Sequence, residues 1–198
     1  DRFGFNNDDA IHDSPRINVA LLGDSYAQGY CVSRENNIAG QLNKQRVTTV
    51  NFGMSGNGFL SYLATFMEYV SPKKIKTTVL VWFYNDMPDT EGESLYANLR
   101  YYLEHGKIRD LRKQQTQIDA KLNEILVENP PIKKGNINWS AYLRGVITLS
   151  AARSTIESAL GIVLSSQRYD GEGNITASSF LIMKKVLKLV LDKVKSWQ

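Results

Sequence analysis

The stretch Ile17-Asn18-Val19-Ala20-Leu21-Leu22-Gly23-Asp24-Ser25 decides the fold. Residues 17–22 form a short, mostly apolar run whose length and composition are typical of a buried strand in a parallel sheet. Gly23 allows the chain to turn sharply where this run ends. The serine that follows lies at the carboxyl end of the strand, where open α/β sheets place their functional sites.

Two more strands and two helices surround this first strand in the sequence. Residues 47–52 are rich in β-branched side chains, and residues 77–84 are nearly all apolar, so both predict strands. Helical spacing of apolar residues predicts a helix that ends near residue 44 and another over 59–70. Strands that alternate with helical crossovers indicate an α/β fold, with a parallel sheet covered by helices on both faces in a flavodoxin-like three-layer sandwich.

The length of 198 residues favours a single domain. We expect four segments: a lead-in (1–16), a core with the functional blocks (17–92), a helical insertion (93–168) and a C-terminal helix (169–198). Within the insertion, the pattern predicts a weak point at Gly106, a loop at 129–138 and a second helical region over 139–164. A turn at 169–174 leads to the last helix, which begins at Thr176 or just after it. No strand follows that helix, so we expect further strands beyond residue 198.

Composition excludes several classes of function. The net charge is only +4, and the lysines of 184–195 have the spacing of a solvated helix flank, which argues against nucleic-acid binding. The single Cys31 cannot form an intrachain disulfide, and no Cys/His grouping has zinc spacing, so we expect no metal site and no cofactor. No stretch has the roughly 20 apolar residues that a membrane span requires. The oligomeric state is not encoded in any recognisable pattern.

Asp24-Ser25 is the first candidate for chemistry. A serine at the start of a helix, directly after a strand, is suited to act as a nucleophile whose reaction passes through an oxyanion. The alternative is structural, because Asp and Ser are also common helix caps.

Two later segments end in polar or glycine-rich tips. The loop Gly53-Met54-Ser55-Gly56-Asn57-Gly58 follows the second strand and can bring a backbone N–H close to Ser25, although such glycines also serve ordinary turns. Asn85-Asp86 follows the third strand, and the Asn85 carboxamide can donate to an oxyanion, although Asn85, Asp86 or Asp89 can equally form an Asx turn or a helix cap. Each tip follows a parallel strand, so all three should meet at one edge of the sheet.

These three blocks resemble those of the SGNH (GDSL-type) serine hydrolases. Gly23-Asp24-Ser25 is similar to the first block, Gly56 to the glycine block and Asn85-Asp86 to the asparagine block, and the surrounding text is similar to bacterial members found with surface-polysaccharide genes. The resemblance covers roughly residues 1–100. It implies that Ser25 is the nucleophile, that its N–H, the Gly56 N–H and the Asn85 side chain form the oxyanion hole, and that Asp24 supports the turn.

The chain departs from the family in two ways. The usual glycine of the third block is Phe83, which we expect to reshape the pocket beside Asn85. The late Asp-x-x-His block, which supplies the acid and the base, is absent. Only His12 and His105 are present. We expect His105 at the end of a helix, and His12 precedes the first strand, so the chain is expected to stop before this block and to be nearly inactive as given.

The resemblance implies an acyl ester as substrate, a small molecule or a carbohydrate, that is hydrolysed or used for acyl transfer in the bacterial periplasm or envelope. The aromatic rings of Tyr26, Phe59, Trp82 and Tyr84 would suit a sugar. The alternative for each of them is ordinary core packing, which is expected for Trp82. A second hypothesis is a catalytically inactive SGNH-like module that binds glycan or scaffolds a partner. A third is a nucleotide-binding protein that uses the glycines of 53–58, but these do not match Gly-x-Gly-x-x-Gly.

Overall fold

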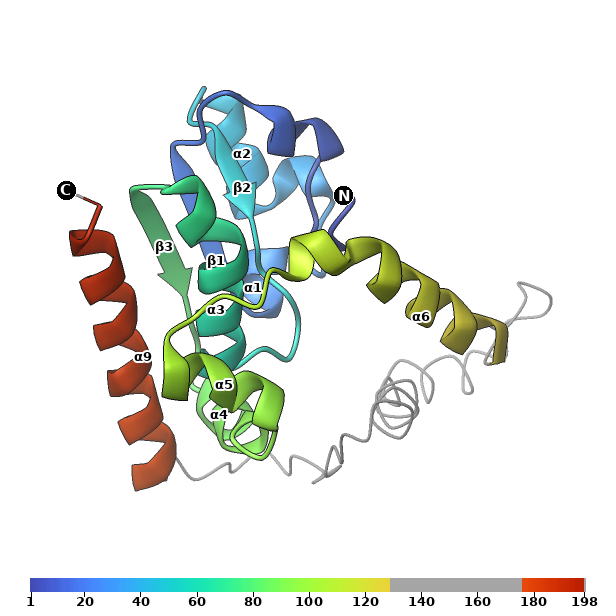
Figure 1. Ribbon diagram of the computed structural model, residues 1–198. Helices are drawn as coiled ribbons and strands as arrows, with labels where there is room; N and C mark the ends of the chain where they lie inside the picture. The colour runs from blue at the N-terminus through green and yellow to red at the C-terminus, as the bar shows by residue number, and fades with distance from the viewer. Residues whose placement is uncertain (129–175, 198) are drawn as a thin grey trace. The chain divides into compact units, whose positions relative to one another are not determined.

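The computed structural model describes residues 1–128 and 176–197, which contain a three-stranded parallel sheet. Strand β1 (Val19–Gly23) lies between β2 (Thr49–Asn51) and β3 (Thr77–Val81), as Figure 1 shows. Strands β2 and β3 lie inside the segments that the sequence predicts, and β1 extends one residue beyond its predicted segment, to Gly23. The α/β class with a parallel sheet is therefore confirmed.

Helices connect the strands and follow them along the chain. They are η1 (Asp9–Asp13), α1 (Ser25–Gln28), η2 (Arg34–Asn36), α2 (Ile38–Lys44), α3 (Phe59–Thr65), the π-helix η3 (Phe66–Val70), η4 (Ser71–Lys73), α4 (Asp86–Glu93), α5 (Ala97–His105), η5 (Leu111–Gln114), α6 (Gln115–Glu128) and α9 (Ala177–Lys195). Within 1–128 and 176–197, no helix combines the length and the apolar character needed to cross a membrane.

The chain divides into two compact units. The sheet, the lead-in and α9 belong to the first unit, which comprises Asp1–Arg112 and Glu172–Gln198. The second unit is Lys113–Gly171, and its described part consists mainly of α6. All the predicted site residues lie in the first unit.

Successive residues of β1 contribute to two different apolar clusters. Ala20 and Leu22 are buried in the large cluster, which also holds α3, whereas Leu21 packs with Ala27 and Ala39 in a small one. This alternation follows from the two-residue period of a strand, whose side chains point to opposite faces. Burial of a leucine side chain stabilises a fold by about 1.5–3 kcal/mol, so both clusters hold β1 in place.

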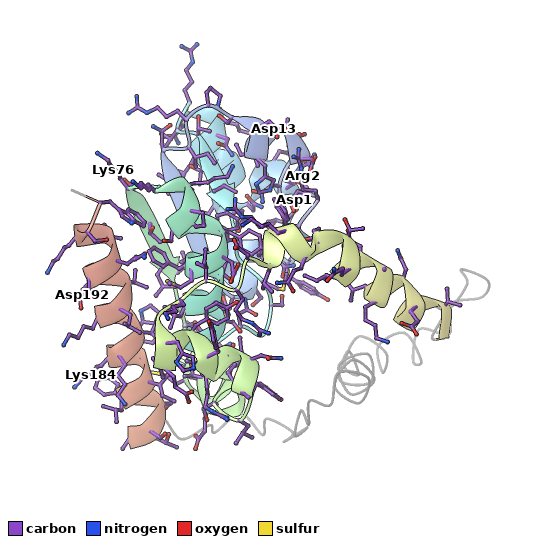
Figure 2. All side chains as sticks on the ribbon, viewed as in Figure 1. Asp1, Arg2, Asp13, Lys76, Lys184 and Asp192 are labelled. Atoms are coloured by element: carbon purple, nitrogen blue, oxygen red, sulfur yellow. The ribbon has the colours of Figure 1, made fainter. Side chains whose placement is uncertain are left out.

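Helix α9 packs against α3 and α4. Its first turn is capped by Thr176, whose hydroxyl accepts a hydrogen bond from the Ser179 amide over 3.1 Å, and Val186 is buried against the core. Lys184 and Asp192 lie on the outer side of the helix (Figure 2). The predicted amphipathic C-terminal helix, including its start, is confirmed.

The lead-in is more ordered than the irregular segment that the sequence predicts. It contains η1, and the Asn7 side chain pairs with the backbone of Asn51 in β2: its Oδ1 accepts from the amide over 2.7 Å and its Nδ2 donates to the carbonyl over 2.8 Å. Phe5 meets Phe52 edge to face at 5.0 Å. The lead-in therefore completes the outer edge of β2.

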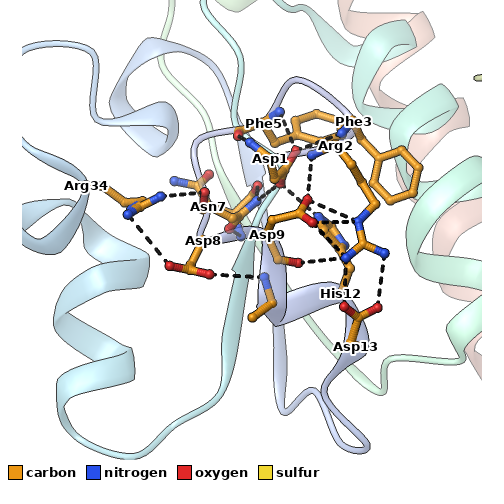
Figure 3. Close-up of polar contacts among 12 residues, drawn as sticks. Asp1, Arg2, Phe3, Phe5, Asn7, Asp8, Asp9, His12, Asp13 and Arg34 are labelled. Carbon is orange, nitrogen blue, oxygen red and sulfur yellow. Dashed lines mark hydrogen bonds and ion pairs between the residues drawn. The ribbon is translucent and has the colours of Figure 1, made fainter.

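Ion pairs support the lead-in at its surface. Figure 3 shows Arg2 between Asp9 and Asp13, with its guanidinium 2.8 Å and 2.7 Å from their carboxylates. Exposed pairs of this kind contribute little to stability, typically about 0–1 kcal/mol. The apolar and backbone contacts of the lead-in contribute more to stability than these ion pairs do.

Strand β3 and the helices after it depart from the prediction. The strand ends at Val81 instead of residue 84, because the Phe83 amide bonds to the side chain of Asp86 and the chain turns into α4. The helical region predicted from 93 begins at Asp86, and it divides into α4, α5 and α6. Gly106 caps α5 in the left-handed conformation, as expected for the weak point. The predicted loop at 129–138, helix at 139–164 and turn at 169–174 lie outside the described residues.

Strand β3 is at the edge of the sheet. Within the part of the chain that the structure describes, it pairs with β1 on one side only. The side chain of Val79 is 41% exposed, although its partner Leu21 is fully buried. The outer edge of β3 is thus less covered than the rest of the sheet.

Candidate functional site

Ser25 lies at the carboxyl end of β1, as predicted. Gly23 ends the strand, Asp24 caps the short helix α1, and Ser25 is the first residue of that helix. The cap is a hydrogen bond of 2.9 Å that the Tyr26 amide donates to Asp24 Oδ1. The carboxylate of Asp24 therefore fixes the turn that presents Ser25, which is the supporting role expected of it.

The second carboxylate oxygen of Asp24 connects the first and third blocks. Ser25 Oγ donates to Asp24 Oδ2 over 3.4 Å, and Asn85 Nδ2 donates to the same oxygen over 3.5 Å. Both contacts are long and thus weak. They nevertheless place the Ser25 hydroxyl and the Asn85 carboxamide around one buried atom, so these two predicted residues are close together.

The loop that contains Gly56 is fastened to the same edge of the sheet. The Met54 amide donates to the Gly23 carbonyl over 3.0 Å, and Gln28 Oε1 accepts from both the amide and the hydroxyl of Ser55, over 3.0 Å and 2.6 Å. Gly56 itself has φ +77°, a conformation that favours glycine. These bonds hold the glycine loop against the end of β1 and against α1.

A buried tyrosine joins the glycine loop to the third block. The Tyr62 hydroxyl lies 2.9 Å from the Asn57 carbonyl and 2.7 Å from Asp86 Oδ2, which also accepts the Phe83 amide over 3.0 Å. Burial raises the pKa of Asp86 to about 6. Asn57 directly follows Gly56, and Asp86 directly follows Asn85. The Tyr62 hydroxyl therefore joins the residues that follow the two predicted oxyanion donors.

Glu93 binds the end of the glycine loop and the first turn of α3. Its carboxylate is buried and accepts the amides of Gly58, Leu60 and Ser61, over 2.7, 2.9 and 3.2 Å, together with the Ser61 hydroxyl. The Phe59 amide donates to the hydroxyl oxygen of Thr90 over 2.8 Å. Burial raises the pKa of Glu93 to about 7 against the opposing effect of these hydrogen bonds. Helix α4 therefore caps α3 from the side.

Sequence reasoning missed Tyr62, Thr90 and Glu93. Their partners are 4 to 35 residues away along the chain, and no short motif joins them. The only local signal is that α3 begins at Gly58 without a capping side chain of its own, which requires an acceptor from elsewhere in the fold.

Neither histidine is placed to act on Ser25 in this structure. His12 is buried in η1 and lies 2.8 Å from an Asp1 carboxylate oxygen, and burial lowers its pKa to about 4. His105 ends α5, as predicted, and its ring meets Tyr101 at 4.7 Å. No hydrogen bond joins either histidine to Ser25 within the described residues.

Four aromatic side chains close to the blocks are exposed. Tyr26, Trp82, Phe83 and Tyr84 are each between 44% and 59% accessible, and the Phe83 ring lies 5.3 Å from Tyr26 and 4.6 Å from Tyr84. The expectation that Trp82 belongs to the core is wrong, because β3 ends before it. Phe59, in contrast, is buried and cannot contact a ligand at the surface.

Other potential binding features lie elsewhere. Within the described residues, no group of three or more His, Cys, Asp or Glu side chains is arranged to hold a metal ion. A cavity of about 400 Å³ lies between the lead-in and α2, and its lining includes Asn7, Arg34 and Asn37. It contains none of the predicted site residues.

Comparison with models of protein families, with curated proteins and with solved structures finds no match for this chain. The resemblance to SGNH hydrolases therefore depends on its three sequence blocks alone.

Proposed function

We propose that this chain carries the nucleophile and the oxyanion groups of a serine esterase or acyltransferase with an SGNH-like three-layer fold. The main support is the shared contact of Ser25 and Asn85 with Asp24 Oδ2, at 3.4 Å and 3.5 Å. Residues that are 60 positions apart in the sequence thus contact the same oxygen atom, which supports a common site for them. The two apolar clusters on either side of β1 support the layered arrangement.

In the proposed reaction, Ser25 Oγ bonds to the acyl carbon while its proton passes to a general base. The carbonyl oxygen becomes an oxyanion, which the amides of Ser25 and Gly56 and the Asn85 carboxamide stabilise. Asn85 must exchange its weak bond to Asp24 for one to the substrate. The intermediate then expels the alcohol, which takes up a proton, and leaves an acyl group on Ser25 for transfer to water or to another hydroxyl.

The proposed base does not come from His12 or His105 as the structure places them. Loss of a base commonly lowers the rate by several powers of ten, so we expect the chain alone to turn over very slowly.

Labelling with a fluorophosphonate probe tests the nucleophile. We expect the full-length protein to be labelled and Ser25→Ala to abolish labelling, while Ser33→Ala, at an exposed serine outside the blocks, leaves it unchanged. Labelling that survives Ser25→Ala would exclude Ser25 as the nucleophile.

A carbohydrate ester is the substrate class that we propose. The four half-exposed rings near Ser25 offer apolar faces for a sugar ring. Asp24 and Asp89 make the immediate surroundings acidic, which disfavours an anionic ligand and favours a neutral acylated sugar.

An inactive SGNH-like module that binds glycan or scaffolds a partner is the second candidate. The observation that favours it is the position of both histidines away from Ser25. In that case the full-length protein would bind glycan but would not react with the fluorophosphonate.

A further inference from the structure

The Tyr62 hydroxyl lies between two oxygen atoms that need protons from it. The Asn57 backbone carbonyl is 2.9 Å away and Asp86 Oδ2 is 2.7 Å away. The side chains of Tyr62 and Asp86 are both buried. A phenol carries one proton, and a carbonyl can only accept. If Asp86 were ionised, one of these two short contacts would join two acceptors with no proton between them.

We propose that Asp86 is a neutral carboxylic acid in mildly acidic solution and that its proton completes a relay that helps to position the glycine loop. Asp86 donates to the Tyr62 oxygen, which frees the phenol proton for the Asn57 carbonyl. Oδ2 keeps a lone pair for the Phe83 amide, which donates over 3.0 Å. The additional proton thus gives both contacts of the Tyr62 hydroxyl a hydrogen, and the contact with the Phe83 amide is kept.

The other carboxyl oxygen supports the same assignment. Asp86 Oδ1 is buried and has no hydrogen-bond partner among the described residues. Burial of an oxygen atom without a hydrogen-bond partner costs far less free energy in a neutral carboxylic acid than in a carboxylate, where that oxygen shares the negative charge. An asparagine cannot replace the acid fully, because no single atom of its amide both donates to Tyr62 and accepts from Phe83.

The charges around this group oppose its ionisation. Asp24 faces it from the end of β1, and Asp89 faces it from its own helix, while Glu93 acts on Tyr62. On α9, which packs against α4, Lys184 lies over the ring of Phe180. Burial and the two acidic neighbours raise the pKa of Asp86 to about 6 from an ordinary value of 3.8.

Deprotonation would remove one of the bonds that hold the glycine loop. Above about pH 6, Tyr62 directs its single proton to the Asp86 carboxylate, and the Asn57 carbonyl loses its donor. The bonds of Met54 and Ser55 remain, so the loop stays attached while the surroundings of the Gly56 amide, next to Asn57, change. Asp86 is thus a positioning residue. The protonation state is independent of the proposed esterase function, whereas an effect on turnover depends on it.

Carbon-13 NMR of the aspartate carboxyl groups tests the assignment directly, with Asp86→Asn to identify the resonance. We expect Asp86 to remain mostly protonated at pH 5, where ordinary aspartates are mostly ionised, and to titrate near pH 6. An ordinary titration near pH 4 would overturn the inference. This measurement uses the unaltered protein, so it does not depend on whether a variant folds.

Amide NMR tests the relay. We expect the Gly56 resonance to shift with the same midpoint as Asp86, to lose this shift in Tyr62→Phe, and to keep it in Tyr30→Phe, at an exposed tyrosine. A Gly56 resonance that is insensitive to the Asp86 titration would refute the relay. If both NMR results hold while Ser25→Ala leaves probe labelling unchanged, only the esterase proposal fails.

Discussion

Replacement of Gly23 by alanine tests how closely β1 and β3 approach beside the site. Gly23 has φ +153°, and a Cβ built there would lie 2.3 Å from the Val81 carbonyl oxygen and 2.7 Å from the Ala27 Cβ. The nearer atom belongs to the backbone of β3, so no side-chain rotation relieves the clash. We expect Gly23→Ala to push β3 away from β1 and to disturb the turn before Ser25.

The magnitude follows from two costs. A non-glycine residue in this backbone region costs about 1–3 kcal/mol. Overpacking at a tight contact costs about 1–3 kcal/mol more. The free energy of unfolding should therefore fall by roughly 2–6 kcal/mol, a large part of the about 5–15 kcal/mol that stabilises a typical domain.

Urea denaturation followed by circular dichroism measures this loss. The matched control is Gly92→Ala, because Gly92 lies in helix α4 and a Cβ there meets no atom within 4 Å. Alanine is the better helix former, so this variant should be as stable as the wild type or more stable by up to about 1 kcal/mol. If the free energy of unfolding of Gly23→Ala is within about 1 kcal/mol of the wild-type value, the argument is refuted.

Three more predictions concern other parts of the first unit. Asn7→Ala leaves the amide and the carbonyl of Asn51 without their buried partner, so urea denaturation should show a loss of about 2–4 kcal/mol. The raised pKa of Glu93, about 7 against an ordinary 4.5, means that the folded state binds this proton more tightly than the unfolded state does. The contribution of Glu93 to stability should therefore be fully present below about pH 4.5 and be lost as the pH rises to about 7, and the difference between the wild type and Glu93→Gln in a pH series of melting curves should follow that course. Tyr26→Ala and Phe83→Ala should leave the melting temperature nearly unchanged, because both rings are half-exposed, but should raise KM for an acetylated oligosaccharide more than for p-nitrophenyl acetate.

The sheet could be predicted because its signals are local. The apolar runs that form β1 and β2 are short, bounded by turn residues and followed by helical spacing. The start of α9 at Thr176 follows from a capping residue before an amphipathic run. Such patterns depend only on neighbours within a few positions.

The end of β3 and the supports of the site could not be predicted in this way. Trp82 and Tyr84 are good strand formers. However, the buried side chain of Asp86 accepts a hydrogen bond from the Phe83 amide, and the chain turns into α4. The position of Glu93 against the start of α3 depends on the tertiary fold, since its partners lie more than 30 residues away. The positions of Ser25 and Asn85 followed from strand order, whereas the network that holds them did not.

The outer edge of β3, along which no strand of residues 1–128 or 176–197 pairs, has a practical consequence for the purified protein. Backbone groups along such an edge are a template for strand addition by another molecule, and the exposed Val79 adds apolar contact. Concentrated samples should therefore self-associate, and a lysine in place of Val79 should keep them dispersed. Light scattering over a concentration series would reveal the difference, and it sets the conditions under which the NMR titrations are informative.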